Sequence, residues 1–460
     1  MFRRVAIIGG GAAAATLLSE LLERKPSQPL HLDWYTGSGS LARGVAYDTV
    51  SDRHLLNVRA ASMSMFAGKP SGFLDFVQRD DPAIAGTDFL PRRRYGDYLE
   101  AEVAHALKQA KANGHDVNVV PFPVEAMVPE RDSVTVIHGE ESHRVDAAVL
   151  ALGSLPPQPL SGVSSDALAS GRYVVDPWPL LAGTENHPPP SKVVLIGLGL
   201  TAVDVLLELS TRWPHTEFTA ISRHGLLPEA HLNAAAAPAG DSAELIESMR
   251  DTPDIHHWLH LLREATAHER DWRTILDSLR PHTSSLWREL DVDQRARFLR
   301  HARWAWERAR HRMPPQAGKS IAMLESEGRL HRQRGRMQSV ELVGDALQMH
   351  LAPAHASSGQ ARPAQTLHAD LVIQTTGMNT DIRRTPHTLV SQLLTNGHIT
   401  PDPLGLGMQA MPDGRLAHDN DYWPNLFAIG SMLRGTLWES TAMPEIRQQA
   451  RSLADRLLAQ

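Results

Sequence analysis

Short apolar runs that end in glycine stand out along the chain. The first covers residues 5–8 and is followed by glycines at 9–11, and the second covers residues 193–196 and is followed by Gly197 and Gly199. A short apolar run bounded by glycine is typical of a buried parallel strand. A helical pattern of apolar residues follows each turn, so both segments predict a strand–turn–helix unit.

Long amphipathic patterns with few glycines occupy residues 241–312, where leucines recur at helical spacing. This segment predicts an all-α insertion. Together with the two strand–turn–helix units, it predicts an α/β fold with two Rossmann-like dinucleotide-binding domains. A third and less regular apolar run, residues 426–429, precedes Gly430 and Ser431.

The first turn has the spacing of a dinucleotide fingerprint, with Gly9, Gly11 and Ala14 in the three small positions. Gly9 permits a tight turn, Gly11 lets the backbone approach a pyrophosphate, and a small residue at Ala14 lets the helix pack on the strand. The next predicted strand should end in an acid for the adenosine ribose, but Thr36 follows it, and Asp33 lies within the strand. We therefore expect hydroxyls such as that of Thr36 to hold the ribose, or this contact to be absent.

The second turn repeats the pattern with Gly197, Gly199 and Thr201. The strand after it ends in a serine followed by Arg223 and His224 instead of an acid. An acid would repel the 2′-phosphate of NADP, whereas an arginine would pair with it. The second turn therefore predicts a preference for NADP over NAD.

The amino-acid composition excludes several classes of protein and of redox site. The chain has 460 residues, enough for two or three domains. Its net charge of −6 and 21% charged residues exclude a disordered chain and a globally basic nucleic-acid binder. It contains no cysteine, which excludes disulfides, iron–sulfur clusters and a redox dithiol. Any redox chemistry must come from a bound cofactor.

The N-terminal segment has two interpretations. Arg3 and Arg4 precede an uncharged run, residues 5–19, which superficially resembles a signal peptide. The glycines in the middle of that run favour the nucleotide-binding interpretation. No other apolar stretch approaches the ~18 residues of a transmembrane helix. We expect a cytoplasmic protein with no membrane partner.

Several motifs carry a resemblance to a known family. They are residues 43–47, 54–58, 94–99 and 434–439, in that order along the chain. With the two glycine turns, they resemble the bacterial YdhS-type FAD/NAD(P)-binding proteins. The likeness continues into the predicted insertion, through residues 271–273, 297–300 and 311–313. More distantly, the chain is similar to class B flavin monooxygenases and N-hydroxylating monooxygenases.

The resemblance implies a glutathione-reductase-like two-dinucleotide fold. Residues 1–183 would form the first part of an FAD-binding domain, residues 190–240 and 313–380 an NAD(P)-binding domain, residues 241–312 the insertion, and residues 381–460 the return to the FAD domain. The resemblance also implies that Gly435 to Glu439 open the final helix, whose N-terminus could stabilise negative charge on the flavin. Further cofactor contacts would be made by Arg43, Ala46, Tyr47, Asn57, Val124, Leu152, Gly153, Thr376, Gly377, Gly430, Ser431 and Leu437.

The expected function is that of an FAD- and NADPH-dependent oxidoreductase. Because a dithiol is absent, the electrons would pass to molecular oxygen or to an organic substrate, and we favour a flavin monooxygenase of a small metabolite, with N-hydroxylation of an amine as one candidate. The alternatives are an FAD-dependent dehydrogenase or oxidase that does not use NADPH catalytically, and a non-enzymatic regulatory protein. The resemblance and their polar character make Asn57, Arg59, Arg434 and Glu439 the candidate catalytic residues.

Other charged and histidine-containing segments carry weaker signals. Seven arginines interleaved with Trp304 and Trp306 lie between residues 295 and 312; an amphipathic helix over the active-site cleft explains them better than a nucleic-acid surface. His256 and His260 have metal-pair spacing but no accompanying motif, so we expect no metal site. Residues 92–94 are all arginine and are expected to form a solvated turn. Asp204 either faces solvent or contacts the cofactor or neighbouring lobe.

Overall fold

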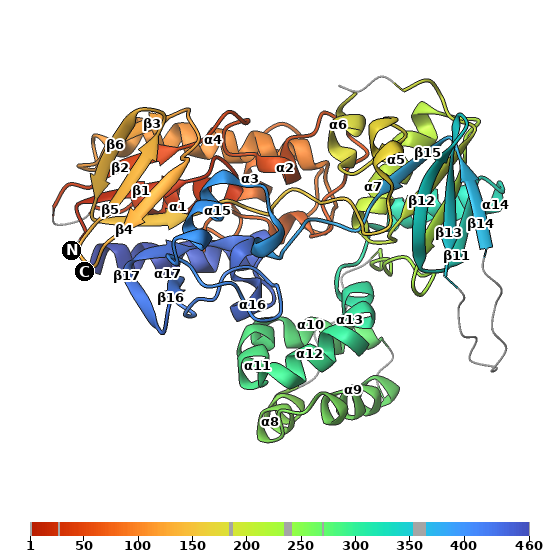
Figure 1. Ribbon diagram of the computed structural model, residues 1–460. Helices are drawn as coiled ribbons and strands as arrows, with labels where there is room; N and C mark the ends of the chain where they lie inside the picture. The colour runs from red at the N-terminus through yellow and green to blue at the C-terminus, as the bar shows by residue number, and fades with distance from the viewer. Residues whose placement is uncertain are drawn as a thin grey trace.

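The computed structural model describes residues 2–25, 28–183, 187–233, 242–268, 271–352 and 365–459. Two sheets with their helices lie side by side, and a layer of helices lies below them in the view of Figure 1. The two chain termini lie next to each other at the outer end of the first sheet. This architecture confirms the predicted α/β class with an all-α insertion.

The first lobe is built on a six-stranded sheet that combines strands from the N-terminal and C-terminal parts of the chain. β1 pairs in parallel with β2 on one side and with β7 on the other, and β17 joins β7 in parallel from the far end of the sequence. In sheet order the strands are β16 (Arg415–His418), β17 (Asp421–Ala428), β7 (Ala147–Leu150), β1 (Arg4–Ile8), β2 (His31–Tyr35) and β3 (Asp116–Val120).

Helices and a small antiparallel sheet cover the two faces of this sheet. Val5 and Ile7 of β1 face the helices, whereas Ala6 and Ile8 face the small sheet, as the two-residue period of a strand requires. The helices of the first lobe are α1 (Ala12–Leu22), α2 (Gly44–Tyr47), α3 (Gly72–Gln78), α4 (Arg92–Ala110), α15 (Thr388–Thr395), α16 (Arg434–Leu437) and α17 (Met443–Ala459). The small sheet consists of β4 (Ala126–Pro129), β5 (Val134–His138) and β6 (Glu141–Val145).

The second lobe repeats this plan on a five-stranded parallel sheet. In sheet order its strands are β11 (Leu330–Arg334), β10 (Glu217–Ser222), β9 (Lys192–Ile196), β15 (Leu371–Gln374) and β8 (Tyr173–Val174). An antiparallel sheet packs on one face and consists of β12 (Met337–Val343), β13 (Ala346–Leu351) and β14 (Gln365–Ala369). The helices are α5 (Ser165–Ala169), α6 (Pro177–Ala182), α7 (Leu200–Arg212) and α14 (Pro315–Ser326).

The described residues of the insertion form six α-helices. They are α8 (Ala243–Asp251), α9 (Ile255–His268), α10 (Trp272–Leu279), α11 (Thr283–Glu289), α12 (Val292–His301) and α13 (Arg303–Arg310). Their apolar faces share one core, which also takes in Trp438 of the first lobe. The domain limits predicted from the sequence stay predictions, and the limit at residues 240–241 lies outside the described residues. No described helix has the length and apolar character needed to cross a membrane.

A buried ion pair and a hydrogen bond connect the two lobes. Arg92, at the start of α4, contacts Asp204 of α7 at 2.8 Å, and only 15% and 7% of their side chains are exposed. Ser51 of the first lobe donates a hydrogen bond to Glu208 of α7 at 2.6 Å. The predicted solvated turn at residues 92–94 is therefore wrong, because these residues form the first turn of α4 and Arg92 is held by the other lobe. Asp204 makes the interlobe contact, which the sequence left as one of two alternatives.

The predicted opening of the final helix at Gly435 is also wrong. The short helix α16 ends at Leu437, and Trp438 adopts a left-handed backbone conformation with φ 58°. A residue with a Cβ is strained there, so packing must hold it in place. Trp438 stacks on Trp287 of α11 with ring centroids 4.8 Å apart. The final helix begins only at Met443.

Candidate functional site

The first glycine turn forms a tight passage between β1 and α1. The N–H of Gly9 donates to the carbonyl of Tyr35 at 2.8 Å, and Gly9 has φ 129°. A Cβ at Gly9 would lie 2.3 Å from the carbonyl oxygen of Ala151, so only glycine fits. Gly11 precedes the first residue of α1, no side chain caps the helix, and Ala14 is fully buried against the sheet. The uncapped N–H groups can therefore bind an anion such as a pyrophosphate.

The acid nearest the end of β2 in the sequence, Asp33, is engaged within the sheet. Asp33 accepts a hydrogen bond from Arg4 at 2.8 Å and one from Asn118 at 3.3 Å within the sheet, so its carboxylate is engaged away from the strand end. The hydroxyl of Thr36 lies 3.3 Å from the carbonyl of Gly37. Thr36 thus presents a hydroxyl where an acid would otherwise stand.

The segment around α2 lies against the first glycine turn. A Cβ at Gly44 would come 3.2 Å from Gly11. The guanidinium of Arg43 is held by Asp97 at 2.6 Å and by Glu100 at 2.7 Å. Because the side chain is engaged in this way, the predicted contact of Arg43 with a cofactor would be made by its backbone. Ala46 is exposed, and Tyr47 packs on Tyr95 with ring centroids 4.7 Å apart.

The turn that follows β17, at Gly430 and Ser431, lies against the start of α1. A Cβ at Gly430 would lie 3.5 Å from Ala13 of α1, and Gly430 has φ 83°. Ser154 donates a hydrogen bond to Ser431 at 3.1 Å, which brings the segment after β7 to this turn. Of the other predicted contacts, Val124 and Leu437 are buried in one apolar core, and Leu152 packs against that core. Gly153, just before Ser154, has φ 68°.

A cavity of about 760 Å³ contains the second glycine turn. The carboxyl ends of parallel strands meet at one edge of a sheet, so the segments after β9, β10 and β15 are brought together there. The sequence-predicted residues in its wall are Gly197, Gly199, Thr201, Arg223, His224, Thr376, Gly377, Arg434 and Glu439. The structure thus brings these nine residues to one cavity, and their contacts to a cofactor stay predictions.

The cavity wall is rich in arginine. Its arginines are Arg223, Arg303, Arg308, Arg336 and Arg434, and its carboxylates are Glu307 and Glu439. Among the described residues, Arg223 and Arg336 pair with no carboxylate. Arg336 was not predicted as a site residue, although it closely follows β11, the strand beside β10. Two free guanidinium groups make this edge suitable for a phosphate.

Helix α13 supplies the wall facing the second glycine turn. Trp304 stacks on His224 with ring centroids 4.1 Å apart, and Glu307 accepts hydrogen bonds from Arg303 at 2.9 Å and from Arg434 at 2.7 Å. The alternation of arginine and tryptophan in this segment predicted an amphipathic helix over a cleft. In the structure, side chains of α13 line the cavity, as that interpretation requires. The roles of Glu307 and His311 were not anticipated.

Glu439 is a poor candidate for a general base. It is 7% exposed, and its carboxylate lies 3.2 Å from the indole nitrogen of Trp306, 3.7 Å from Arg310 and 3.8 Å from His311. Burial opposes its ionisation, but His311 and Arg310 overcome that effect and lower the pKa of Glu439 to about 2. At neutral pH it is a fixed anion that ties α13 to the segment after α16.

Asn57 and Arg59 lie in another group of side chains. The carbonyl of Asn57 lies 3.2 Å from Nε2 of His231, and Arg59 donates hydrogen bonds to the carbonyls of Thr87 at 2.7 Å and Leu232 at 2.9 Å. Burial and the nearby Arg312 lower the pKa of His231 to about 3. Of the four candidate catalytic residues, Arg434 and Glu439 line the cavity, whereas Asn57 and Arg59 are not among its described lining residues.

A second, apolar cavity of about 200 Å³ lies inside the helical insertion. Trp306 and the ring of Trp287 are in its wall, and Trp438 lines both this cavity and the larger one. Trp438, the residue with the strained backbone, therefore borders both spaces.

Residues 6–155 match the family model described as FAD-NAD(P)-binding. A comparison with curated protein sequences gives no significant match. Among solved structures, the chain is similar to L-lysine 6-monooxygenase from Pseudomonas syringae, with 17% identity, 99% of both chains covered and a TM-score of 0.64.

Two further structures have the same fold. The ornithine N-hydroxylase KtzI of Kutzneria sp. 744 is 16% identical over 99% of both chains, with a TM-score of 0.61. The cadaverine monooxygenase DfoA of Erwinia amylovora is 12% identical over 100% of this chain and 95% of its own, with a TM-score of 0.62. These likenesses confirm the two-dinucleotide-binding-domain fold.

Proposed function

We propose that the chain is an FAD- and NADPH-dependent oxidoreductase, and specifically a flavin monooxygenase that acts on a small metabolite with molecular oxygen. One observation carries the proposal: one cavity is lined by the second glycine turn, by Arg434 of the first lobe, and by Arg223 and Arg336, which pair with no carboxylate in the part of the chain that the structure describes. The family model over residues 6–155 supports a flavin nucleotide at the first turn. Membership of the YdhS-type group and a cytoplasmic location belong to the same proposal and rest on the sequence.

The residues of both turns fit their cofactors. At the first turn, Gly9 packs tightly on the backbone of Ala151, and the uncapped start of α1 leaves N–H groups that can bind a pyrophosphate. At the second, Gly199 precedes α7 without a side-chain cap, and Arg223 would pair with the 2′-phosphate of NADPH. A bound flavin would supply the redox chemistry, which no side chain of this cysteine-free protein provides.

The chain's own residues orient the reactants and exclude water. α13 covers the cavity, and its Glu307 holds Arg434 beside Trp438. Both carboxylates of the wall are already paired with basic groups. An amine substrate would therefore have to be recognised by other groups than these two glutamates.

Replacement of Arg223 by alanine is expected to weaken NADPH binding roughly 10- to 100-fold, because a charge-assisted contact to the 2′-phosphate is lost. NADH, which lacks that phosphate, should bind the variant and the wild type about equally. Titrations of both nucleotides measure the difference. Arg332→Ala, on the exposed face of β11 and outside the cavity wall, is a matched control. Equal losses for NADPH and NADH would contradict the assignment.

The absorbance spectrum of the purified protein tests the reaction type. Addition of NADPH without oxygen should bleach the flavin absorbance, and admission of air with the right substrate should give an oxygenated product together with NADPH consumption. Stoichiometric hydrogen peroxide with every substrate tested would instead indicate an oxidase. A colourless protein that takes up no added FAD would refute the proposed function.

A further inference from the structure

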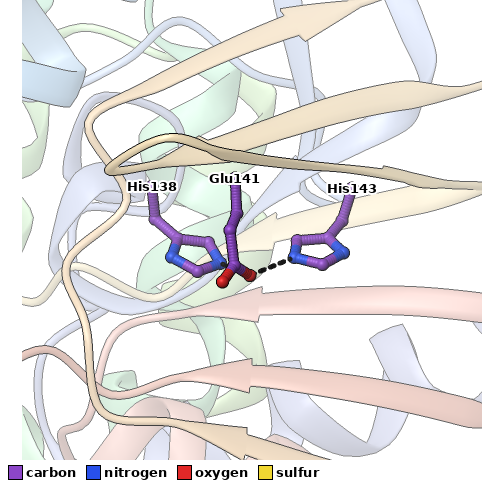
Figure 2. Close-up of side chains that lie close together, drawn as sticks. All are labelled: His138, Glu141 and His143. Atoms are coloured by element: carbon purple, nitrogen blue, oxygen red, sulfur yellow. Dashed lines mark hydrogen bonds and ion pairs between the residues drawn. The ribbon is translucent and has the colours of Figure 1, made fainter.

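Three side chains with metal-binding atoms meet at the tip of the hairpin formed by β5 and β6. They are His138, Glu141 and His143, and their ligand atoms all lie within 4.8 Å of one another. Figure 2 shows the carboxylate of Glu141 between the two imidazoles. Nε2 of His143 lies 3.2 Å from the Glu141 carboxylate, and Nε2 of His138 lies 3.7 Å from it.

The hairpin itself brings these residues to one face. His138 pairs directly with Glu141 across a two-residue turn, and Gly139 takes the first turn position with φ 55°, as a type II′ turn requires. His143 lies two residues beyond Glu141, so it projects from the same face of β6. On that face the apolar residues Val134, Val136 and Val145 give way at the tip to the three polar groups.

The burial of His138 indicates that the cluster is more than a surface hydrogen-bond chain. Its side chain is 9% exposed, and Nε2 is buried with no hydrogen-bond partner among the described residues. The rings of Tyr35 and Phe122 flank it, with centroids 5.4 and 6.2 Å away. A buried polar atom without a partner is uncommon, and here it faces two further ligand-type side chains.

We propose that His138, Glu141 and His143 form a binding site for Zn²⁺, with water completing the coordination. With metal–ligand bonds of about 2.1 Å, the ligand atoms of a tetrahedral site are about 3.4 Å apart, which is close to the separations between Glu141 and the two imidazoles. Two imidazoles and one carboxylate favour zinc and similar transition metals over Mg²⁺ or Ca²⁺. The site is independent of the proposed flavin chemistry, and the sequence analysis did not anticipate it.

Equilibrium dialysis of the full-length, chelator-treated protein against micromolar Zn²⁺ tests the site. We expect one Zn²⁺ per chain, and a loss of affinity on the order of 100-fold in His143→Ala and in Glu141→Gln, since even groups outside the coordination sphere contribute 10- to 100-fold. Glu140→Gln, which changes the exposed carboxylate next to Glu141 in the same turn, is the matched control and should bind as the wild type does.

The chain has 24 histidines, so binding alone is insufficient and the variants decide the outcome. Thermal unfolding with and without Zn²⁺ provides a second measurement: the metal should raise the midpoint of the wild type and of Glu140→Gln but not of the two ligand variants. Absence of Zn²⁺ binding by the wild type would overturn the proposal, and so would undiminished binding by His143→Ala and Glu141→Gln. Neither result would affect FAD content or NADPH oxidation, so the proposed function is tested separately.

Discussion

Replacement of Gly199 by valine is expected to weaken NADPH binding on the order of 100-fold, or by about 2.8 kcal/mol, while thermal stability stays close to that of the wild type. Gly199 lies in the cavity wall immediately before α7. Its backbone is extended, with φ −83° and ψ −170°, a conformation that valine adopts readily. An added Cβ would meet no described atom within 4 Å, so the new side chain would occupy only the space that the pyrophosphate needs.

A substitution at Gly197, two residues earlier, should affect folding instead of nucleotide binding alone. Gly197 has φ 112°, and a Cβ there would lie 2.6 Å from the carbonyl oxygen of Thr375. Gly197→Ala should therefore lower the unfolding midpoint, whereas Gly199→Val should not. Nucleotide titration and thermal unfolding of both variants separate a binding defect from a folding defect. If Gly199→Val binds NADPH as tightly as the wild type, the cofactor does not approach this turn.

The glycine turns were predictable because their geometry is local. A buried strand, a left-handed glycine and a helix start follow one another within a few residues, and the sequence around Gly9 and Gly197 shows all three. Arg223 was predictable for the same reason, since it directly follows the neighbouring strand. The sheet then brings these local units together at the carboxyl ends of its strands.

The remaining parts of the site depend on contacts between distant segments. Asn57 and Arg59 carry family-like motifs, yet His231 and Leu232, which contact them, are about 170 residues away in the chain. The strained conformation of Trp438 results from its packing against α11, which no local pattern around residue 438 reveals. The cluster of His138, Glu141 and His143 depends on local geometry instead. A two-residue turn that begins at Gly139 puts His138 opposite Glu141, so this pairing could have been predicted from the sequence.

We expect the carboxylate of Glu439 to stabilise the folded protein and not to transfer protons during catalysis. Glu439→Gln should lower the free energy of unfolding by about 3 kcal/mol, because loss of one partner from a buried ion pair leaves the other charge poorly compensated. That partner is Arg310, which is 8% exposed and lies 3.7 Å from Glu439. Without Glu439, Arg310 keeps only the more distant carboxylate of Glu445 at 3.9 Å, which Arg280 already engages. Denaturant unfolding at neutral pH measures the loss.

The dependence of this effect on pH follows from the pKa of Glu439, which the folded protein lowers from 4.5 to about 2. A carboxyl with a lowered pKa stabilises the fold fully above about pH 4.5, and this contribution is lost as the pH falls toward 2. The difference between wild type and Glu439→Gln should therefore shrink over that window. The double variant Glu439→Met with Arg310→Met, which removes both charges, should recover most of the stability, while Arg280 keeps Glu445 paired at 2.7 Å. Unchanged unfolding of Glu439→Gln with a reduced kcat would instead show that Glu439 acts as a catalytic base.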